Sequence, residues 1–314
     1  MVEEIKVAYV FPGQESQAVG MGLDLYVHYS SAREVFDEVD KALGFPLSRL
    51  CFEGPDEDLK QTVNAQPAIV ATSIACYRAA QETSQDGLPV PTFVAGHDVG
   101  AYSALVVAQA LSLSDAVRLV RERGRLMNEA GQRTPGGMLS MTGLDIETIR
   151  TVCLTTGTEI AYIDAPDQIA ISGTQESLAK ARRLLQLKGA RRILPMKVTG
   201  PFYSPLMESA LVRLRNAIAG FTFNKPIVPI VANVTAQPLT DIEAIKEELI
   251  SQIVHQVRWQ QSVENMIAGG VSTFFEMGPG EALTKLIKRV SPGAQVFNIS
   301  TSQTVAEIIN WRRG

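Results

Sequence analysis

One short stretch of the sequence, residues 91–110, limits the possible folds more than any other. It begins with PTFVA (91–95), which reads as a buried strand, and the turn sequence GHDVG (96–100) follows at once. A ten-residue helical pattern, AYSALVVAQA, comes next. Short apolar runs that alternate with helical patterns favour a parallel sheet covered by helices. The stretch therefore predicts an α/β fold with a sharp strand-to-helix turn at its centre.

The same alternation continues on both sides of this turn. Further strands are predicted at 6–10, 227–234 and 271–278, and further helices at 66–81, 114–130, 241–254 and from Gly280 onward. Pro67 is expected near the start of its helix, where a missing N–H costs nothing. Ser114 is expected to cap the helix that begins there.

Residues 131–198 follow a different pattern. Strand, helix, strand, strand, helix and strand signals occur in turn at 136–143, 145–156, 159–164, 168–173, 176–189 and 190–198. That order is the one of a ferredoxin-like βαββαβ unit. We therefore expect two domains: a large α/β domain made of 1–130 and 199–314, and an inserted ferredoxin-like subdomain over 131–198.

The composition narrows the class of protein. With 46% hydrophobic and 20% charged residues, the chain resembles an ordinary globular protein, and a net charge of -4 gives no sign of a nucleic-acid or anionic-membrane partner. No apolar run of about 18 residues predicts a membrane span. The three cysteines and three histidines are scattered, without metal-ligand spacing. We expect a cytoplasmic protein that binds no metal.

The turn at 96–100 has the layout of the G-x-S-x-G nucleophile elbow, with Asp98 where that motif has serine. A sharp turn of this kind lifts its middle side chain into a pocket. The helix that follows offers free N–H groups to a developing oxyanion. Taken alone, however, G-x-D-x-G is more often a strand–helix turn with an aspartate cap.

Four further motifs, together with the elbow and its helices (95–127), add weight to the functional interpretation. They are VFPGQESQAVGMG (10–22), NAQPAIV (64–70), GPFYSPLM (200–207) and FFEMGPGEALTKLI (274–287). In this order they resemble the malonyl-CoA:acyl-carrier-protein transacylase family, which includes the acyltransferase domains of fatty-acid and polyketide synthases. The resemblance covers nearly the whole chain and implies an α/β-hydrolase-like large domain.

The resemblance also implies a reaction. In that family a serine attacks the thioester of malonyl-CoA, a histidine acts as base, and the phosphopantetheine thiol of acyl carrier protein then takes the malonyl group without a cofactor. The family serine falls on Asp98 and the histidine on Tyr203. The arginine that pairs with the malonyl carboxylate falls on Arg123. The backbone N–H groups of Gln14 and Val99 would form the oxyanion hole.

Other positions are carried over in the same way. The backbone carbonyl that orients the family histidine should belong to Gln252, and Gln66 matches a glutamine near the pocket. Two more positions depart from the family pattern besides Asp98 and Tyr203. Glu15 stands where a glycine is usual, and Ala101 stands where the elbow helix usually has glutamate.

These substitutions should impair the transfer reaction. A carboxylate that attacks a thioester gives a mixed anhydride, and a tyrosine with a reference pKa near 10 is a poor base at neutral pH. We expect Arg123 to pair with Asp98, with a hydrogen bond from Tyr203, so that a built-in anion partly fills the malonyl site. Ser16, Ser103 and Ser204 are poor replacements for the nucleophile, because none of them sits on an elbow. His97 is expected to be a packed structural histidine.

Three hypotheses remain open at this stage. The chain is an impaired or altered acyltransferase that acts on malonyl-CoA and acyl carrier protein; or it is a non-catalytic paralogue that binds CoA or a carrier protein; or it is an engineered or mis-sequenced form of an active enzyme. Four departures across three motifs favour natural divergence over the last hypothesis. We expect a monomer.

Overall fold

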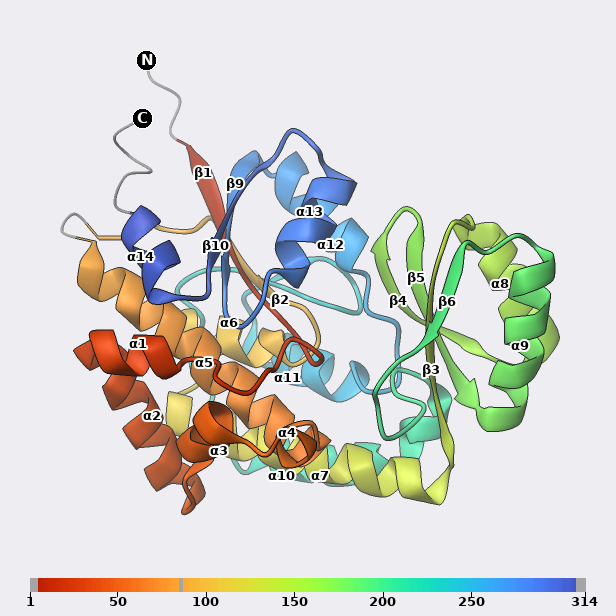
Figure 1. The fold of residues 1–314 in the computed structure, drawn as a ribbon, viewed down its shortest axis with the longest axis horizontal. Helices are drawn as coiled ribbons and strands as arrows, with labels where there is room; N and C mark the ends of the chain where they lie inside the picture. Colours follow the sequence, from red (N-terminus) through yellow and green to blue (C-terminus); the bar gives the residue numbers. More distant parts are fainter. Residues whose placement is uncertain (1–4, 85–86, 309–314) are drawn as a thin grey trace.

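A six-stranded sheet forms the centre of the larger part of the molecule (Figure 1). The computed structural model describes residues 5–84 and 87–308. The strand order is β10-β9-β1-β2-β7-β8, with β8 antiparallel and the other neighbours parallel. The strands are β1 Lys6–Phe11, β2 Phe93–Gly96, β7 Ile230–Val231, β8 Pro238–Leu239, β9 Val271–Met277 and β10 Gln295–Ile299. Every residue of β1 after Lys6 is buried, as expected for a parallel strand that is covered on both faces.

Helices lie on both sides of this sheet, with α5 and α14 on one side of β9 and β10 and with α12 and α13 on the other (Figure 1). The buried helix α5 packs against α2, α6 and α7. The helices here are α1 Leu23–His28, α2 Ser30–Leu43, α3 Leu47–Glu53, α4 Asp56–Leu59, α5 Thr62–Thr83, α6 Gly100–Val107, α7 Leu113–Arg133, α10 Leu211–Ala219, α11 Ile242–Ser251, α12 Trp259–Ala268, α13 Ala282–Val290 and α14 Ser302–Ile308, with a 3₁₀ turn at Pro205–Ala210.

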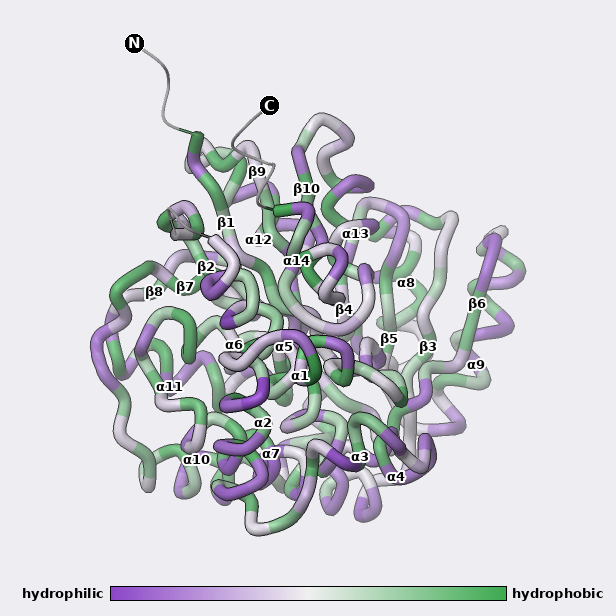
Figure 2. Tube along the Cα trace, turned by 60° about the vertical axis from the view of Figure 1, so that its left-hand side comes forward, coloured by the Kyte–Doolittle hydropathy of each residue, from purple (hydrophilic) through white to green (hydrophobic). Residues whose placement is uncertain are grey.

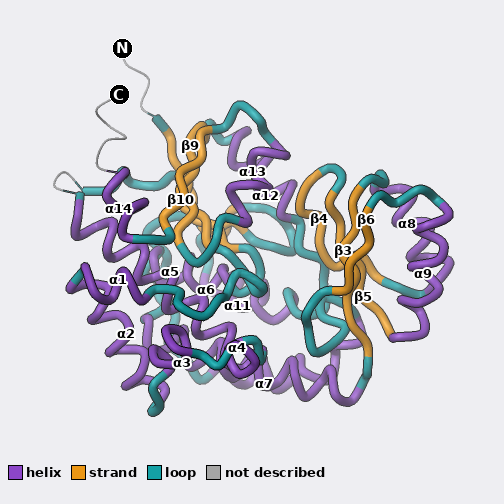
Figure 3. Tube along the Cα trace, viewed as in Figure 1, coloured by secondary structure: helices purple, strands orange, loops and turns teal. Residues whose placement is uncertain are grey.

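A second sheet stands apart from the first (Figure 3). Its four antiparallel strands follow the order β4-β5-β3-β6, and they are β3 Gly136–Thr142, β4 Glu159–Ala165, β5 Gln168–Thr174 and β6 Arg192–Pro195. The helices α8 Ile146–Thr156 and α9 Gln175–Leu187 cover its outer face (Figure 1). They enclose a core separate from that of the large sheet. We call β3 to β6 with α8 and α9 the four-stranded unit.

The helix α9 illustrates why this unit folds as it does. Its buried residues recur at three- to four-residue spacing, Ser177, Leu178, Ala181 and Leu185. Most other residues of the helix are hydrophilic, so its tube alternates between the two colours of Figure 2. A helix with one apolar stripe must bury that stripe against another element, here β3 and β5. The limits of the unit at residues 131 and 198 stay a prediction.

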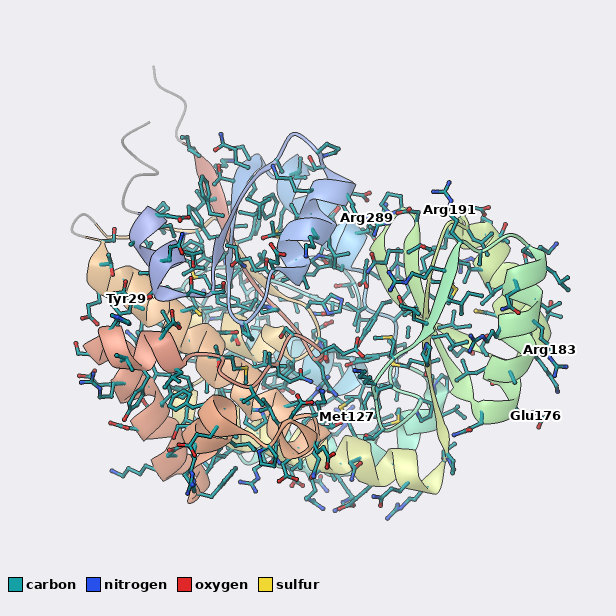
Figure 4. The ribbon with its side chains drawn as sticks, viewed as in Figure 1. Tyr29, Met127, Glu176, Arg183, Arg191 and Arg289 are labelled. Atoms are coloured by element: carbon teal, nitrogen blue, oxygen red, sulfur yellow. The ribbon has the colours of Figure 1, made fainter. Side chains whose placement is uncertain are left out.

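Several contacts join the four-stranded unit to the large sheet and its helices. The backbone of β4 pairs with the segment before α12, where Val257 donates to the Ala161 carbonyl at 2.8 Å and accepts from Ile163 at 3.0 Å. Arg289 of α13 reaches across to Asp167 and Gln168 in the β4–β5 turn, as Figure 4 shows for its side chain. The two units therefore meet along β4.

The structure corrects two predicted helix starts. The helix expected at 66–81 begins at Thr62, with Pro67 inside it, because its first turn packs closely against α7 at Gly124. The helix expected to begin at Ser114 begins at Leu113 instead. Its cap is Ser112, whose hydroxyl accepts from the Asp115 N–H at 3.1 Å.

The predicted strand 227–234 shrinks to Ile230–Val231. The reason lies just after the strand, at Asn233. Its backbone N–H donates to the Glu248 carboxylate of α11 at 2.6 Å, so the chain leaves the sheet there. Among the described residues, no helix is both long and apolar enough to cross a membrane.

The close approach of α6 to β1 predicts a specific intolerance at Gly100. A Cβ on Gly100 would lie 2.2 Å from the Phe11 carbonyl oxygen and 2.8 Å from that of Pro12. Gly100→Ala should therefore lower the free energy of unfolding by about 1–3 kcal/mol, as overpacking does. Chemical denaturation measures the change.

Gly293→Ala is the matched control, since a Cβ there would have nothing within 4 Å. It should leave the stability within about 0.5 kcal/mol of the unmodified protein. Equal effects of the two substitutions would contradict the packing described for Gly100.

Candidate active site

The elbow turn lies where β2 ends and α6 begins, and it forms as the sequence predicts. Asp98 has a φ of 53°, a left-handed conformation that aspartate tolerates better than most residues. A Cβ on Gly96 would lie 1.9 Å from the carbonyl carbon of Gly100, so only glycine fits at that position. The turn therefore has the tight geometry of a nucleophile elbow, with an aspartate at its tip.

A chain of buried polar groups holds the backbone of the elbow. Asn233 accepts from the Asp98 N–H at 2.9 Å and donates to the Gly96 carbonyl at 2.9 Å. Glu248 fixes Asn233 in turn, as described above. Gln252 donates its side-chain amide to the Asp98 carbonyl at 3.1 Å. These side chains come from α11 and the segment after β7, so the elbow is tied to residues far away in the sequence.

The Asp98 side chain forms a buried ion pair with Arg123 of α7. Arg123 Nη2 lies 2.7 Å from Asp98 Oδ1, and both side chains are fully buried, at 0% exposed. The same Nη2 donates to Gln252 Oε1 at 3.0 Å. Burial lowers the pKa of Arg123, but the Asp98 carboxylate outweighs it and leaves that pKa above its usual value. Arg123 therefore stays charged, and the predicted pairing with Asp98 is confirmed.

Tyr203 lies against this pair. Tyr203 is buried, and its ring packs on that of Tyr162 with centroids 4.8 Å apart. Burial and then the Asp98 charge raise the pKa of Tyr203 well above 10, so the phenol keeps its proton. By distance and angle, neither its hydroxyl nor Asp98 Oδ2 has a hydrogen-bond partner among the described residues, although a side-chain interaction with Asp98 adds to the raised pKa of Tyr203. The predicted hydrogen bond from Tyr203 to Asp98 stays a prediction.

The predicted role of Gln252 is corrected. Its backbone carbonyl was expected to orient the side chain at position 203, but the Tyr203 hydroxyl makes no such bond, and the Tyr203 N–H donates to Ile253 instead. It is the side chain of Gln252 that enters the site. With its oxygen on Arg123 and its amide on the Asp98 carbonyl, it bridges the two partners of the ion pair.

The other two predicted residues of the pocket lie on α5 and in the loop after β1. Gln66 is fully buried, and its amide contacts Met127 Sδ at 3.5 Å, one helical turn beyond Arg123 on α7. Gln14 donates its side-chain amide to Thr62 Oγ1 at 3.3 Å. Both side-chain oxygens lack a hydrogen-bond partner among the described residues. Arg123 Nε and Nη1 also lack a hydrogen-bond partner among the described residues, so several polar atoms around the ion pair remain unbonded.

The two predicted oxyanion donors are free. Neither the Gln14 N–H nor the Val99 N–H donates to any group of the described residues. Their segments touch, because a Cβ on Gly13 would lie 2.5 Å from the His97 carbonyl oxygen and 3.2 Å from Asp98 Cβ. Two free N–H groups on adjoining loops are what an oxyanion hole requires.

A cleft of about 410 Å³ opens beside the elbow, between the β1 loop, α13 and the four-stranded unit. Its walls include Pro12, Gly13, Gln14, Glu15, Ser16, His97, Ser140, Tyr162, Asp164, Gln168, Ala170, Met196, Ala282, Leu283, Lys285, Leu286 and Arg289. Asp98, Arg123 and Tyr203 are not among them. The open space therefore ends one residue short of the elbow tip. Tyr203 lines a separate cavity of about 640 Å³ together with Cys153 and His255.

Sequence reasoning missed several residues of this region. His97 does turn away from the elbow, as expected, but it lines the cleft and lies 2.8 Å from Asp164 of β4. Asp164 falls in none of the quoted motifs, and neither do Asn233 and Glu248. Only the position of His97 next to Asp98 was a signal. Among the described residues, no group of histidine, cysteine, aspartate and glutamate side chains could hold a metal ion.

The buried ion pair should show strong energetic coupling. Asp98→Asn and Arg123→Met each leave one buried charge without its partner, which typically costs about 3–5 kcal/mol. The double variant removes both charges and should cost less than the sum of the two. Chemical denaturation of the four proteins measures the coupling energy.

Arg49→Met provides the comparison, because Arg49 and Glu53 form an exposed pair, with side chains 73% and 64% accessible. It should change stability by no more than about 1 kcal/mol. Additive effects of Asp98→Asn and Arg123→Met would contradict the coupling.

Comparisons with known proteins agree with this geometry. The family model described as an acyl transferase domain matches residues 8–310. The malonyl CoA-acyl carrier protein transacylase of Bacillus subtilis (strain 168) is 41% identical over 305 residues, which are 96% of this chain and 95% of that protein. The transacylase of Escherichia coli (strain K12) is 40% identical over 287 residues, which cover 90% of this chain and 92% of that one.

Solved structures of malonyltransferases are similar to this chain over nearly its whole length. The acyl-carrier-protein-S-malonyltransferase from Bartonella henselae superposes with a TM-score of 0.94 at 37% identity, over 99% of this chain and 100% of that one. A malonyl-transacylase in complex with a type II PKS acyl-carrier protein gives 0.93 at 35% identity, over 97% and 99%. With the elbow, the oxyanion loop and Arg123 in place, we conclude that this chain belongs to the malonyl-CoA:acyl-carrier-protein transacylase family.

Proposed function

We propose that this chain binds the thioester ligands of its relatives, malonyl-CoA and the acyl carrier protein, but transfers malonyl through position 98 very poorly. The single observation that carries the proposal is the buried ion pair of Arg123 and Asp98. It joins the position of the family nucleophile to the position of the family carboxylate-binding arginine. The aspartate at position 98 thus affects both the transfer reaction and the recognition of the malonyl carboxylate.

The chemistry is affected because the two reacting groups are missing. An ionised Asp98 has no proton to give, and its attack on a thioester would form a mixed anhydride rather than an ester. Tyr203 cannot act as base, since burial and the Asp98 charge keep its pKa well above 10. Removing a nucleophile or its base typically costs about 10⁴- to 10⁶-fold in rate, and the two losses do not add.

Recognition is affected because Asp98 occupies Arg123. A malonyl carboxylate that approached Arg123 would meet a second anion already held at 2.7 Å from Nη2. Like charges in a water-excluded site repel strongly. Arg123 Nε and Nη1 have no partner among the described residues, so a small neutral polar group could still accept from them. We therefore propose that the site disfavours malonyl relative to an uncharged acyl group.

Binding of the thioester itself is supported by the features that remain. The Gln14 and Val99 N–H groups are free to meet a thioester carbonyl, and the cleft beside them has about 410 Å³ of space. Lys285 and Arg289 line that cleft and would attract the phosphates of CoA or of phosphopantetheine. A carrier-protein partner agrees with a relative whose structure holds an acyl-carrier protein.

A non-catalytic role as a CoA- or carrier-binding paralogue is the second candidate. The observation that favours it is the preserved elbow, which Asn233 and Gln252 hold by hydrogen bonds although no nucleophile is present. A monomeric state and a cytoplasmic location stay predictions.

The proposal predicts the outcome of a malonyl-transfer assay with purified holo acyl carrier protein. The unmodified protein should transfer malonyl at or near background. Restoring both groups in Asp98→Ser/Tyr203→His should raise the rate about 10³-fold or more, and each single variant should recover far less, because the two groups act as a unit.

Ser103→Ala is the control for a substitute nucleophile, since Ser103 lies one helical turn beyond the elbow and is buried. It should leave the background rate unchanged. Transfer by the unmodified protein at the rate of an ordinary transacylase would overturn the proposal.

A further inference from the structure

The cleft contains an acid–base pair that the transfer reaction does not use. His97 Nε2 lies 2.8 Å from Asp164 Oδ1, and both side chains line the cleft. The two residues come from different units, His97 from the elbow and Asp164 from β4. Because the ionised carboxylate only accepts hydrogen bonds, it selects the tautomer with the proton on Nε2. The other ring nitrogen, Nδ1, then carries the lone pair of a base.

The structure holds this imidazole firmly. Its ring meets Tyr162 at 4.9 Å and Trp259 at 5.6 Å between centroids, edge-on in both cases. Nδ1 faces Gly13 in the loop after β1, where a Cβ would lie only 3.0 Å away, and no described residue bonds to it. A side chain at Gly13 would press on this nitrogen, so glycine is the residue that lets the oxyanion loop approach the base closely.

We propose that His97 and Asp164 make this cleft a thioesterase site, in which His97 activates a water molecule against a bound acyl thioester. His97 Nδ1 takes a proton from the water while its oxygen bonds to the thioester carbonyl carbon. The Gln14 N–H stabilises the oxyanion that develops. As the intermediate collapses, the carbon–sulfur bond breaks and the leaving sulfur takes the proton from His97. The net reaction converts an acyl thioester and water into a carboxylic acid and a thiol.

The roles divide between the two residues. His97 is the catalytic base because it contacts the reacting water, whereas Asp164 is a positioning residue that acts through His97. Burial lowers the pKa of His97, but Asp164 and, more weakly, Asp98 raise it above its usual value. Glu15 faces the pair from the β1 loop, with its carboxylate on the Lys197 N–H at 2.9 Å. The inference rests on the proposed function, because the cleft must first bind a thioester.

A purely structural role is the alternative, since the pair also ties the elbow to the four-stranded unit. The structure offers a way to separate the two roles. In His97→Gln, the glutamine amide can still donate a hydrogen bond to Asp164, but it cannot take a proton from water as the imidazole does. Asp167→Asn instead weakens a second contact between the units, the ion pair of Arg289 with Asp167, without touching His97.

The test measures thiol release from acetyl-CoA without carrier protein, over a range of pH. The unmodified protein should release CoA above the buffer rate, and the rate should rise with pH as His97 loses its proton. His97→Gln should lower the rate about 10²- to 10⁴-fold. Asp164→Asn should lower it too and move the rise to lower pH, because it removes a charge that raises the pKa of His97. Asp167→Asn should keep the rate of the unmodified protein at saturating acetyl-CoA; any change should be confined to KM, because Asp167 pairs with Arg289, which lines the cleft.

Two controls keep the result interpretable. Thermal unfolding checks that each variant folds, and calorimetry with CoA checks that it still binds. If CoA binds but no thiol is released above buffer, or if release survives in His97→Gln, the inference is overturned while the proposed function stands. If CoA does not bind to the unmodified protein, or if malonyl transfer proves fast, it is the proposed function that fails.

Discussion

The ion pair between Arg123 and Asp98 is the interaction on which the chemistry of this molecule depends. It is fully buried, so both charges have lost their water, and each depends on the other for electrostatic stabilisation. Gln252 bridges both partners, and Asn233 and Glu248 hold the backbone on which Asp98 sits. The polar groups of the site thus hold one another in place by hydrogen bonds among themselves.

This arrangement explains how the elbow of a family site can be preserved with an aspartate at its tip. The left-handed turn at Asp98 is strained for most residues, yet aspartate accepts it, so the elbow survives the loss of its serine. The positive charge of Arg123 needs a partner in the buried site, and Asp98 provides one permanently. The same substitution that removes a nucleophile therefore also supplies the anion that balances Arg123.

The proposed hydrolysis takes place in the cleft beside the elbow tip. Asp98 at the tip is fully buried, whereas His97 and Asp164, although largely buried, line the cleft together with the loop of Gln14. A base, an oriented carboxylate and a free N–H group are the parts that a water-based reaction needs. In the proposed hydrolysis a water molecule, rather than a side chain at position 98, attacks the thioester.

Local patterns were enough to predict the parts of the structure that depend on short stretches of chain. The order of strands and helices and the elbow turn followed from local patterns, whereas the pairing of Asp98 with Arg123 was expected from the family resemblance. The failures involve partners far away in the sequence. The start of α5 depends on packing at Gly124, the short β7 depends on Glu248, and Asp164 meets His97 only because β4 folds against the elbow. No pattern within 91–110 could reveal contacts of that range.

The central claim is that Asp98 occupies the place of a malonyl carboxylate, and comparative calorimetry tests it most directly. Malonyl-CoA and acetyl-CoA would be titrated into the unmodified protein and into Asp98→Ser. We predict that the unmodified protein binds acetyl-CoA at least as tightly as malonyl-CoA. Asp98→Ser should favour malonyl-CoA by about tenfold or more, a change of about 1.4 kcal/mol. A preference of the unmodified protein for malonyl-CoA as large as that of Asp98→Ser would contradict the account.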